Sequence, residues 1–463
     1  MAPRPLTRRE FLQASAVTAA SFALASCSGE SATRRAINTD TLWPIKRVIY
    51  VMMENRSFDH LFGRFPGANG TTVGNMLGRE IPLAQASQWT LHDLPHDQQA
   101  FLRETNDGQM DHFVDTSLQE VFAYTQFHEE DIPNYFHWAH EFVLCDNFFA
   151  SSSGNSYPQH LYMIAGQSGG TWDAPEQSRA VRKVREDQGL AKTWGCDAPE
   201  GAYLWVADRS PRLDEPPESF AKAIKPCLTF KTQGDQLNEA GIDWAYYSPA
   251  DYQVGYIWNA YAAFDRFLNS DQWDKHIRPV DRLIQDIHEQ RLPSVTWVTP
   301  RYELSDHPPW SVCYGHNWVT GIVNAVMRSP MWRHTAIFIT WDEWGGFYDH
   351  VPPPQVDSFG LGIRVPLLII SPYAERGLVS HEEGEFSSPQ KLIADNWGLS
   401  YLTDRVRRTT NYEHVFDFKA RPRDPDPRDP NRHCTGTRFK AKWDIEEWKK
   451  LPGFDGINLS QFT

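Results

Sequence analysis

The chain has 463 residues, of which 41% are hydrophobic and 22% are charged, and its formal net charge is −14 at pH 7. These values are typical of a globular protein and leave room for one large α/β domain with insertions or for two domains. The acidic balance and the lack of a basic run argue against binding to nucleic acid, and no apolar run is long enough to span a bilayer.

The N-terminal segment has the form of an export signal. Residues 7–12 (TRREFL) contain a pair of arginines followed by Phe-Leu, and a modest apolar segment of small residues comes next. This order predicts a twin-arginine signal peptide over residues 1–27, with the twin-arginine export machinery as partner. Residues 24–27 (LASC) resemble a lipoprotein processing box, which makes Cys27 a predicted lipidation site; ordinary cleavage after Ala25 is the alternative. The mature protein is then expected to be periplasmic, a membrane-anchored lipoprotein or secreted.

An apolar run at residues 48–53 is the first element of the fold. It follows a Ser-, Thr- and Ala-rich stretch, residues 28–42, that reads as a tether. The run predicts a strand buried on both faces of a parallel sheet, and it ends in Glu54 and Asn55. Strand ends are where α/β sheets place their ligand sites, and both side chains offer oxygen donors for a hard cation. A plainer interpretation is that they cap a short helix at 57–62.

Two loop regions supply further candidate residues. Residues 64–110 have weak periodicity and predict loops, in which His96 is by itself an ordinary surface histidine. An apolar run at 142–145 leads into a serine-rich turn that carries Ser156 and enters a predicted helix at 161–165. Such a turn suits an exposed nucleophile, because the free N–H groups and the dipole of the helix point outward there. A serine-rich surface loop is the alternative.

The following elements alternate between strands and helices. Residues 171–235 are polar and contain prolines, which predicts an insertion or cap. A proline-containing turn presents His307, and the apolar run at 335–341 ends in a second acidic pair, Asp342 and Glu343. Further strands are predicted at 242–250, 293–299 and 365–370, and helical segments at 135–140, 257–291, 316–328 and 389–397.

The C-terminal residues differ in composition from the rest. Residues 416–463 begin with a run rich in Pro and Asp, which predicts an extended arm followed by a short tail. Besides Cys27 the chain has five cysteines without CxxC spacing, so a zinc cluster is not expected. In an exported protein Cys196 and Cys227 are a candidate disulfide pair, and the odd count leaves a free thiol that we expect to be buried.

The alternation of strands and helices predicts an α/β/α sandwich with a mostly parallel central sheet and inserted cap segments. If the strands that end in Glu54-Asn55 and Asp342-Glu343 are neighbours, these side chains converge at one edge of the sheet. Three buried carboxylates without a cation would be costly. We therefore expect one divalent metal ion, and all-oxygen ligands favour Ca²⁺, Mg²⁺ or Mn²⁺ over Zn²⁺. Two unrelated, solvated or capping pairs are the alternative.

A metal ion, a serine and turn-borne histidines together indicate phosphoryl or sulfuryl transfer. The metal polarises an ester oxygen and lowers the pKa of the nucleophile. We expect Ser156 to attack phosphorus and to form a phosphoserine, which water then hydrolyses. Imidazoles donate hydrogen bonds to the phosphoryl oxygens or protonate the leaving alkoxide.

Residues 51–63 (VMMENRSFDHLFG) are similar to the N-terminal signature of the bacterial phosphoesterase family, which contains bacterial phospholipases C and a related acid phosphatase. This family belongs to the alkaline-phosphatase-like superfamily. The resemblance continues through further segments, which are 142–163, 302–309, 335–354 and 363–388. It implies an alkaline-phosphatase-like catalytic domain over residues 43–415.

The same resemblance implies a role for each residue that matches a family motif. The implied metal ligands are Glu54, Asn55, Asp342 and Glu343. The implied catalytic residues are Ser156 as nucleophile and His307 and His96 as contacts to the phosphoryl group. Asn55 and His350 are implied to bind substrate, and Asp349 to support the site from outside the ligand set.

The turn around Ser156 departs from the phospholipase pattern. It reads Gly-Asn-Ser-Tyr-Pro-Gln where the phospholipases more often have Gly-Pro-Thr-x-Pro-Asn, so its serine resembles the acid phosphatase branch. The expected substrate is therefore a phospholipid such as phosphatidylcholine, cleaved by phospholipase C activity, or a broad range of phosphomonoesters. An exported protein that binds metal or phosphate without turnover is the alternative from another class; Ser156 and His307 argue against it.

Overall fold

The computed structural model describes most of the chain, namely residues 40–88, 93–113, 122–176 and 193–434. The predicted signal peptide with Cys27 and most of the predicted tether lie outside the described residues, as do parts of the predicted cap and tail. Within the described ranges, no helix is both long enough and apolar enough to cross a membrane.

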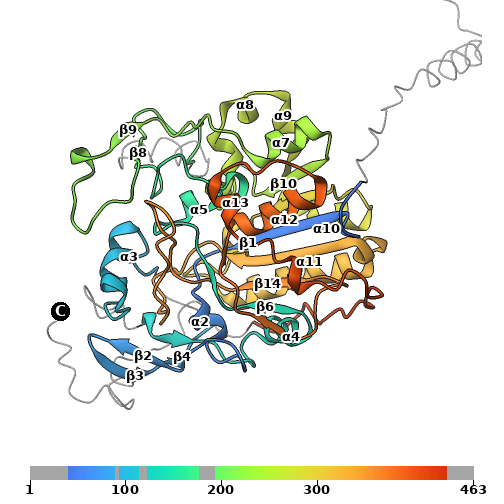
Figure 1. Ribbon diagram of the computed structural model, residues 1–463, viewed down its shortest axis with the longest axis horizontal. Helices are drawn as coiled ribbons and strands as arrows, with labels where there is room; N and C mark the ends of the chain where they lie inside the picture. The colour runs from blue at the N-terminus through green and yellow to red at the C-terminus, as the bar shows by residue number, and fades with distance from the viewer. Residues whose placement is uncertain (1–39, 89–92, 114–121, 177–192, 435–463) are drawn as a thin grey trace, which may run out of the picture. The chain divides into compact units, whose positions relative to one another are not determined.

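An eight-stranded sheet forms the centre of the protein (Figure 1). In spatial order its strands are β11 (Ile277–Pro279), β10 (Trp244–Ser248), β12 (Val295–Val298), β1 (Arg47–Met53), β13 (Thr335–Trp341), β14 (Leu367–Ile370), β6 (Val143–Cys145) and β15 (Leu378–Ser380). β14 is antiparallel to both of its neighbours, and all other adjacent pairs are parallel. The prediction of a mostly parallel sheet is confirmed.

β1 and β13 lie side by side in the middle of this sheet. Every residue of β13 and all but the first residue of β1 are buried. A strand covered on both faces has a continuous apolar sequence, and burial of each large aliphatic side chain stabilises the fold by about 1.5–3 kcal/mol. The parallel register places Met53 opposite Trp341. The chain therefore leaves both strands at the same edge of the sheet.

Helices cover both faces of the sheet. Side chains alternate between the two faces along a strand, so residues of β13 that are an odd number of positions apart point to opposite faces. Trp341 of β13 packs on Tyr135 of α4, with ring centroids 5.4 Å apart. On the other face, Phe338 of β13 contacts Tyr50 of β1. Burial and then the charge of Glu385, just before α12, raise the pKa of Tyr50. Helices thus lie on both faces, and the predicted α/β/α sandwich is confirmed.

The shorter elements surround this core. The α-helices are α2 (Phe58–Phe62), α3 (Gln98–Thr105), α4 (Pro133–Glu141), α5 (Ser156–Ala165), α7 (Gln233–Ala240), α8 (Asp265–Leu268), α9 (Asp271–His276), α10 (Leu283–His288), α11 (Val312–Arg328), α12 (Ser387–Trp397) and α13 (Asp404–Arg408). The 3₁₀ helices are η1 (Asn106–Gly108), η3 (Pro217–Ser219), η4 (Tyr256–Trp258), η5 (Ala260–Ala263), η6 (Val280–Arg282), η7 (Tyr302–Leu304), η8 (Pro330–His334) and η9 (Glu413–Val415). Two-stranded sheets pair β2 (Val73–Met76) with β3 (Arg79–Pro82), β4 (Ala84–Gln85) with β5 (Thr125–Gln126), β7 (Phe148–Phe149) with β16 (Gly384–Glu385), and β8 (Leu204–Val206) with β9 (Lys222–Ile224).

The segment 257–291 is divided into short elements, so the prediction of a helical stretch there is wrong in part. Ser270 begins α9 as a new helix, because its side chain accepts a hydrogen bond from the backbone N–H of Gln272. The edge strand β11 follows and ends at Pro279, which has no N–H to continue a helix. Short-range capping and proline thus override the helical pattern.

The cysteines behave as the sequence predicts. Cys196 and Cys227 form a disulfide, and among the described residues the free thiol is Cys145 of β6, which is buried. A second disulfide joins Cys313 of α11 to Cys434. The sequence did not predict this second pair, because its partners are 121 residues apart.

Residues 421–434, which fall within the predicted arm, contain no helix or strand. The arm packs against α4 and α11. The side-chain amide of Asn134 donates to the carbonyl oxygen of Asp429 at 3.0 Å, and that of Asn324 donates to the carbonyl oxygen of Arg428 at 2.6 Å. Together with the second disulfide, these contacts attach the arm to the domain.

Acid should weaken the packing of α4 on α11 through His316. This side chain is buried and its Nε2 accepts the backbone N–H of Asn134 at 3.0 Å. Burial lowers the pKa of His316 to about 4, whereas an unfolded histidine has a pKa of about 6.5. The stabilisation that neutral His316 contributes is complete above the pKa of the unfolded state. It is lost as the pH falls towards the pKa of the folded state, and the total loss in the free energy of unfolding is about 3 kcal/mol. Urea unfolding at pH 7 and pH 5 should show a smaller pH dependence for His316→Gln than for the wild type; equal dependence would contradict this assignment.

Candidate active site

The four predicted metal ligands lie at the ends of β1 and β13. Glu54 and Asn55 follow β1, Asp342 and Glu343 follow β13, and all four side chains are fully buried. The backbone N–H of Asn55 donates to Asp342 Oδ1 at 2.8 Å. The structure thus brings the two pairs together, as expected for the ends of neighbouring parallel strands. We call these four residues the strand-end cluster.

Burial perturbs the carboxyl groups of this cluster. It raises the pKa of Glu54 and of Glu343 well above the ordinary range, and the charge of Asp342 raises both further. Burial also raises the pKa of Asp342 itself. Three carboxyl groups in this environment cannot all stay ionised without a positive charge beside them.

Unpartnered atoms show that the cluster fits a divalent cation. Among the described residues, Glu54 Oε2, Asp342 Oδ2, Glu343 Oε1 and both polar atoms of the Asn55 side chain are buried without a hydrogen-bond partner. Such atoms are costly, and a cation satisfies several of them at once. Glu54 and Asp342 also form a group with His160 whose ligand atoms lie within 4.8 Å of one another. The choice of metal remains a prediction, because a nitrogen donor at His160 weakens the all-oxygen argument against Zn²⁺.

α5 brings Ser156 to the cluster. The side chain of Asn155 accepts a backbone N–H of the first turn and caps the helix, so α5 begins at Ser156 and not within 161–165 as predicted. Ser156 is 3% exposed. Its hydroxyl faces the carboxyl groups of Glu54 and Asp342, where burial raises the pKa of both and the hydrogen bond from the serine offsets part of that rise. A hydroxyl in this place, at the positive end of a helix, has the surroundings of an activated nucleophile.

His160 is a site residue to which the sequence reasoning gave no role. It lies one helical turn after Ser156, on the same face of α5. Its Nε2 is 3.0 Å from Glu54 Oε1 and 3.9 Å from Asp342 Oδ2. Burial lowers the pKa of His160 to about 3, so the ring is neutral. The spacing of four residues from the candidate nucleophile was the signal that could have identified it.

His307 and His96 come together from two loops. Their ring centroids are 6.0 Å apart, and His307 is 8% exposed. Burial lowers the pKa of His307 to about 4. The indole of Trp258 lies 6.1 Å from the His307 ring and 6.5 Å from the His160 ring. The side chain of Trp258 therefore lies near both the histidine pair and α5. This places the two predicted histidines close to the strand-end cluster.

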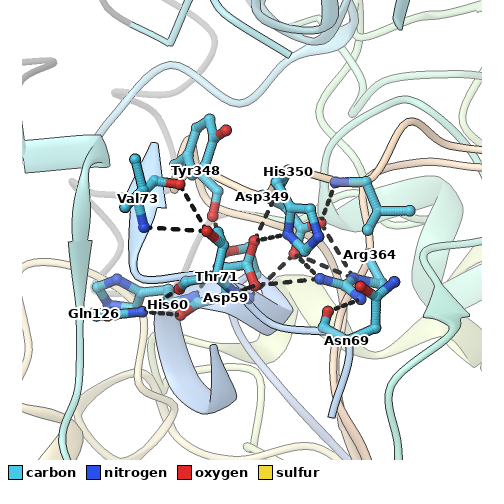
Figure 2. Close-up of polar contacts among 12 residues, drawn as sticks. Asp59, His60, Asn69, Thr71, Val73, Gln126, Tyr348, Asp349, His350 and Arg364 are labelled. Atoms are coloured by element: carbon cyan, nitrogen blue, oxygen red, sulfur yellow. Dashed lines mark hydrogen bonds and ion pairs between the residues drawn. The ribbon is translucent and has the colours of Figure 1, made fainter. Parts of the chain in front are cut away.

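Asp349 and His350 belong to a neighbouring set of charged side chains around Arg364 (Figure 2). Arg364 is fully buried; its Nε is 3.1 Å from Asp349 Oδ1 and its Nη2 is 3.3 Å from Asp59 Oδ1. Nδ1 of His350 lies 2.6 Å from Asp59 Oδ2. We call these four residues the Arg364 network. It connects α2 to the segments after β13 and before β14, and it holds His350 against Asp59.

The fold and the site together define a class of protein. Buried carboxyl groups at the ends of adjacent parallel strands, with a serine at a helix start beside them, are the layout of a hydrolase that acts on esters. A family model described as the Phosphoesterase family matches residues 45–400. Because this match covers most of the chain, the protein belongs to the Phosphoesterase family.

Several relatives of this chain are phospholipases by name. The hemolytic phospholipase C of Pseudomonas aeruginosa is 27% identical, over 85% of this chain and 59% of that protein. The non-hemolytic phospholipase C of Burkholderia pseudomallei is 26% identical, over 92% of this chain and 68% of that protein. Non-specific phospholipase C6 of Arabidopsis thaliana is 26% identical, over 82% and 74% respectively. The chain thus covers less than two thirds of the length of the Pseudomonas aeruginosa protein.

Solved structures match at low similarity. A protein of the alkaline phosphatase superfamily from Vibrio parahaemolyticus is 11% identical, over 78% of this chain and 68% of that chain, with a TM-score of 0.35. The phosphonate monoester hydrolase of Agrobacterium radiobacter is also 11% identical, over 77% and 74%, with a TM-score of 0.35. The family assignment rests on the sequence match and not on these scores.

Proposed function

We propose that this protein is a metal-dependent phosphoric ester hydrolase that works through a phosphoserine at Ser156. The observation that carries the proposal is the place of Ser156 at the start of α5, facing Glu54 and Asp342. The unpartnered oxygens of the strand-end cluster support a bound cation, and membership of the Phosphoesterase family supports the phosphate ester.

The residues of the strand-end cluster would hold the metal ion, with His160 as an added donor. When bound there, a divalent ion supplies Lewis acidity for a phosphoryl oxygen and lowers the pKa of a nearby hydroxyl. The chain's own residues do the rest. Glu54 and Asp342 face the Ser156 hydroxyl, so either carboxylate can take its proton as the oxygen becomes a nucleophile.

In the first half of the reaction, the Oγ of Ser156 forms a bond to phosphorus while the ester P–O bond breaks. The leaving oxygen takes up a proton from water on the side where His307 and His96 lie, and the carboxyl group that took the serine proton returns it to Oγ in the second half. In the second half, water attacks the phosphoserine, the Oγ–P bond breaks and the serine hydroxyl is restored. We assign His350 and Asp349 a structural role, in preference to direct contact with substrate. His350 hydrogen-bonds to Asp59, and Asp349 accepts a hydrogen bond from Arg364. These contacts hold the segment after β13 in place.

The names of the relatives support a phospholipid as substrate, cleaved on the phosphate side of the glycerol as a phospholipase C does. A second candidate is a broad range of phosphomonoesters. The serine at position 156 favours it, because the phospholipase pattern more often has threonine there.

Two substrates separate these candidates. With Ca²⁺, Mg²⁺, Mn²⁺ or Zn²⁺ supplied, the purified protein should release phosphocholine from phosphatidylcholine vesicles and should turn over an aryl phosphate more slowly. Release of phosphate from the aryl phosphate alone would favour the second candidate. Turnover of neither substrate with any of the four ions would refute the enzyme proposal.

We also propose export by the twin-arginine route, with Cys27 as the lipidated residue. The arginine pair at Arg8 and Arg9 supports this route, and the two disulfides fit an oxidising compartment. Replacing both arginines by lysine should leave unprocessed protein in the cytoplasm, as measured by fractionation and immunoblotting. The Cys27→Ala variant should reach the periplasm without a lipid. Normal export of the double-lysine variant would contradict the route.

A further inference from the structure

Asp173 connects the two loops that carry Ser156 and His96. Its carboxyl group accepts the backbone N–H of Asn155, the residue before Ser156, at 3.3 Å. The same carboxyl group accepts the backbone N–H of Gln98, two residues after His96, at 3.1 Å. We propose that Asp173 is a positioning residue for the reaction, which sets the place of Ser156 relative to His96 through these two hydrogen bonds. This role rests on the proposed function.

The segment after α5 folds back and brings Asp173 to the start of that helix. Ser168 Oγ donates to the carbonyl oxygen of Thr171 at 2.6 Å, and Thr171 Oγ1 donates to the carbonyl oxygen of Asp173 at 3.1 Å. Gly154 of the serine-rich turn lies directly against this segment, because a Cβ atom there would be 1.3 Å from the carbonyl oxygen of Trp172. The backbone that carries Asp173 therefore packs tightly on the turn that carries the candidate nucleophile.

The two N–H groups that Asp173 accepts are ones that helices leave without a partner. Gln98 is the first residue of α3, and Asn155 caps α5. N–H groups at these positions have no acceptor within the helix, and they lie at its positive end, where a polar oxygen is favoured. Oδ1 of Asp173 is within hydrogen-bond distance of both groups. A single oxygen atom thus joins the starts of the two helices.

This connection matters because the reaction needs fixed distances between its groups. Catalytic side chains must be held within about 0.5 Å of the productive geometry. A second contact runs between the same elements, from Ser153 Oγ to Gln98 Oε1 at 2.7 Å, but it joins two side chains that can rotate. The contacts of Asp173 are made to the backbone, so they position the whole of each loop.

The surroundings of Asp173 favour its neutral form. Burial, and then the charge of Asp97, raises the pKa of Asp173 to about 8, although the two N–H groups and the charge of His96 act in the opposite direction. Other acids line the cavity of about 480 Å³ beside Asp173, namely Glu176, Asp214 and Glu215. At pH 7 the carboxyl group is therefore mostly neutral, and it holds the two loops as a hydrogen-bond acceptor and not as a charge.

A role for the charge is the competing explanation. The acids of this cavity, with Trp172 and Trp205 on its wall, would attract the cationic part of a substrate, and Asp173 would then act through its carboxylate. The two roles predict opposite orders for two conservative variants. Asp173→Asn keeps an oxygen in the place of Oδ1 and removes the charge, whereas Asp173→Glu keeps the charge and moves the oxygens by one methylene group.

Steady-state kinetics at pH 7, with the metal ion supplied, tests the inference on an aryl phosphate and on phosphatidylcholine vesicles. We expect kcat to fall by about 10²-fold on both substrates in Asp173→Ala and in Asp173→Glu, because small displacements of reacting groups have effects of this size. KM should change by less than about threefold, since the lost interaction acts on the chemical step. Asp173→Asn should stay within about threefold of the wild type in kcat, because its oxygen still accepts both N–H groups.

Asp243 provides the matched control. It is also a partly buried aspartate, and its Oδ1 accepts the backbone N–H of Ser294 at 3.1 Å. It precedes β10, which runs parallel to β12 and through it to β1, so it lies at the edge of the sheet opposite to the strand-end cluster. In urea unfolding, Asp243→Ala should lower the midpoint about as much as Asp173→Ala does, and it should keep the kcat of the wild type.

Hydrogen exchange adds a measurement that does not depend on activity. In the wild type the amides of Gln98 and Asn155 are hydrogen-bonded to Asp173. Mass spectrometry should show faster exchange of the peptides that contain these amides in Asp173→Ala, and exchange at the rate of the wild type in Asp173→Asn. Unchanged exchange in Asp173→Ala would overturn the proposed connection.

The kinetic outcomes are equally decisive. A kcat of Asp173→Ala equal to that of the wild type would overturn the inference. So would a higher kcat for Asp173→Glu than for Asp173→Asn, or a loss confined to phosphatidylcholine, because either result would show that the charge acts on the substrate. The order of these two variants decides the question even if Asp173→Ala does not fold. A wild type that is inactive on both substrates would refute the hydrolase and this role together, whereas an active wild type with unchanged Asp173→Ala would refute the role alone.

Discussion

Replacing Ser156 by alanine should lower kcat for phosphate ester hydrolysis by at least about 10⁴-fold, because the variant lacks the atom that bonds to phosphorus. The substitution removes only a hydroxyl, and the cap of α5 at Asn155 does not depend on it. The fold and the metal content should therefore be unchanged. Rapid acid quenching followed by intact mass spectrometry should detect a phosphoenzyme in the wild type and none in the variant.

Two further serine substitutions make this test specific. Ser153 lies in the same turn, is buried and donates to Gln98 Oε1 at 2.7 Å, so Ser153→Ala disturbs the turn and leaves Ser156 in place. It should keep its phosphoenzyme. Ser156→Thr restores a hydroxyl and should recover part of the activity lost in Ser156→Ala. If Ser156→Ala still forms a phosphoenzyme, the nucleophile is a different residue.

The sequence predicted the strand-end cluster because its signal is local. Apolar runs that end in Glu54-Asn55 and Asp342-Glu343 identify buried parallel strands, and such strands end at one edge of a sheet. The sequence alone could not show that β1 and β13 are adjacent, since neighbours in a parallel sheet can be separated by about a dozen residues or by far more. The register that places Met53 opposite Trp341 comes from the packed sheet.

The start of α5 was missed for a different reason. Pro158 interrupts the apolar pattern and makes a helix appear to begin after it. Proline is tolerated in the first turn, however, because the N–H groups there have no partner within the helix. Asn155 supplies the cap, so α5 begins at Ser156. With that start, His160 lies one turn from Ser156 and becomes recognisable as a site residue.

Contacts between distant segments were beyond sequence reasoning. Arg364 meets Asp59 across 305 residues, and Trp258 meets both His160 and His307 from a segment predicted to be a plain helix. No local pattern indicates that Arg364 is buried, since arginine is usually exposed. The family resemblance implied substrate contact for His350, and the contact of its ring with Asp59 could not be predicted from the sequence.

Arg364→Met should therefore destabilise the fold strongly. Methionine keeps much of the side-chain volume over the Phe58 ring but leaves the carboxyl groups of Asp59 and Asp349 buried without their cation. Breaking a buried pair in this way costs about 3–5 kcal/mol. Guanidinium unfolding at pH 7.5 should show the loss as a lower midpoint. Arg209→Met is the matched control, because Arg209 also lies 4.4 Å from a ring, that of Phe220, and pairs with Glu215 near the surface. Its midpoint should change far less.

The pH dependence of the Arg364→Met effect tests its electrostatic origin. In the wild type burial raises the pKa of Asp349 to about 6, and Arg364 acts in the opposite direction. Without Arg364 that folded pKa must rise further, while the unfolded value stays at about 3.9. An acid whose pKa is raised by folding costs stability as pH rises from the unfolded to the folded value. The wild type stops losing stability near pH 6, and the variant continues to lose it above that pH. The difference between them should thus be larger at pH 8 than at pH 5. An equal difference at both pH values would mean that lost packing, and not the unpaired carboxylates, destabilises the variant.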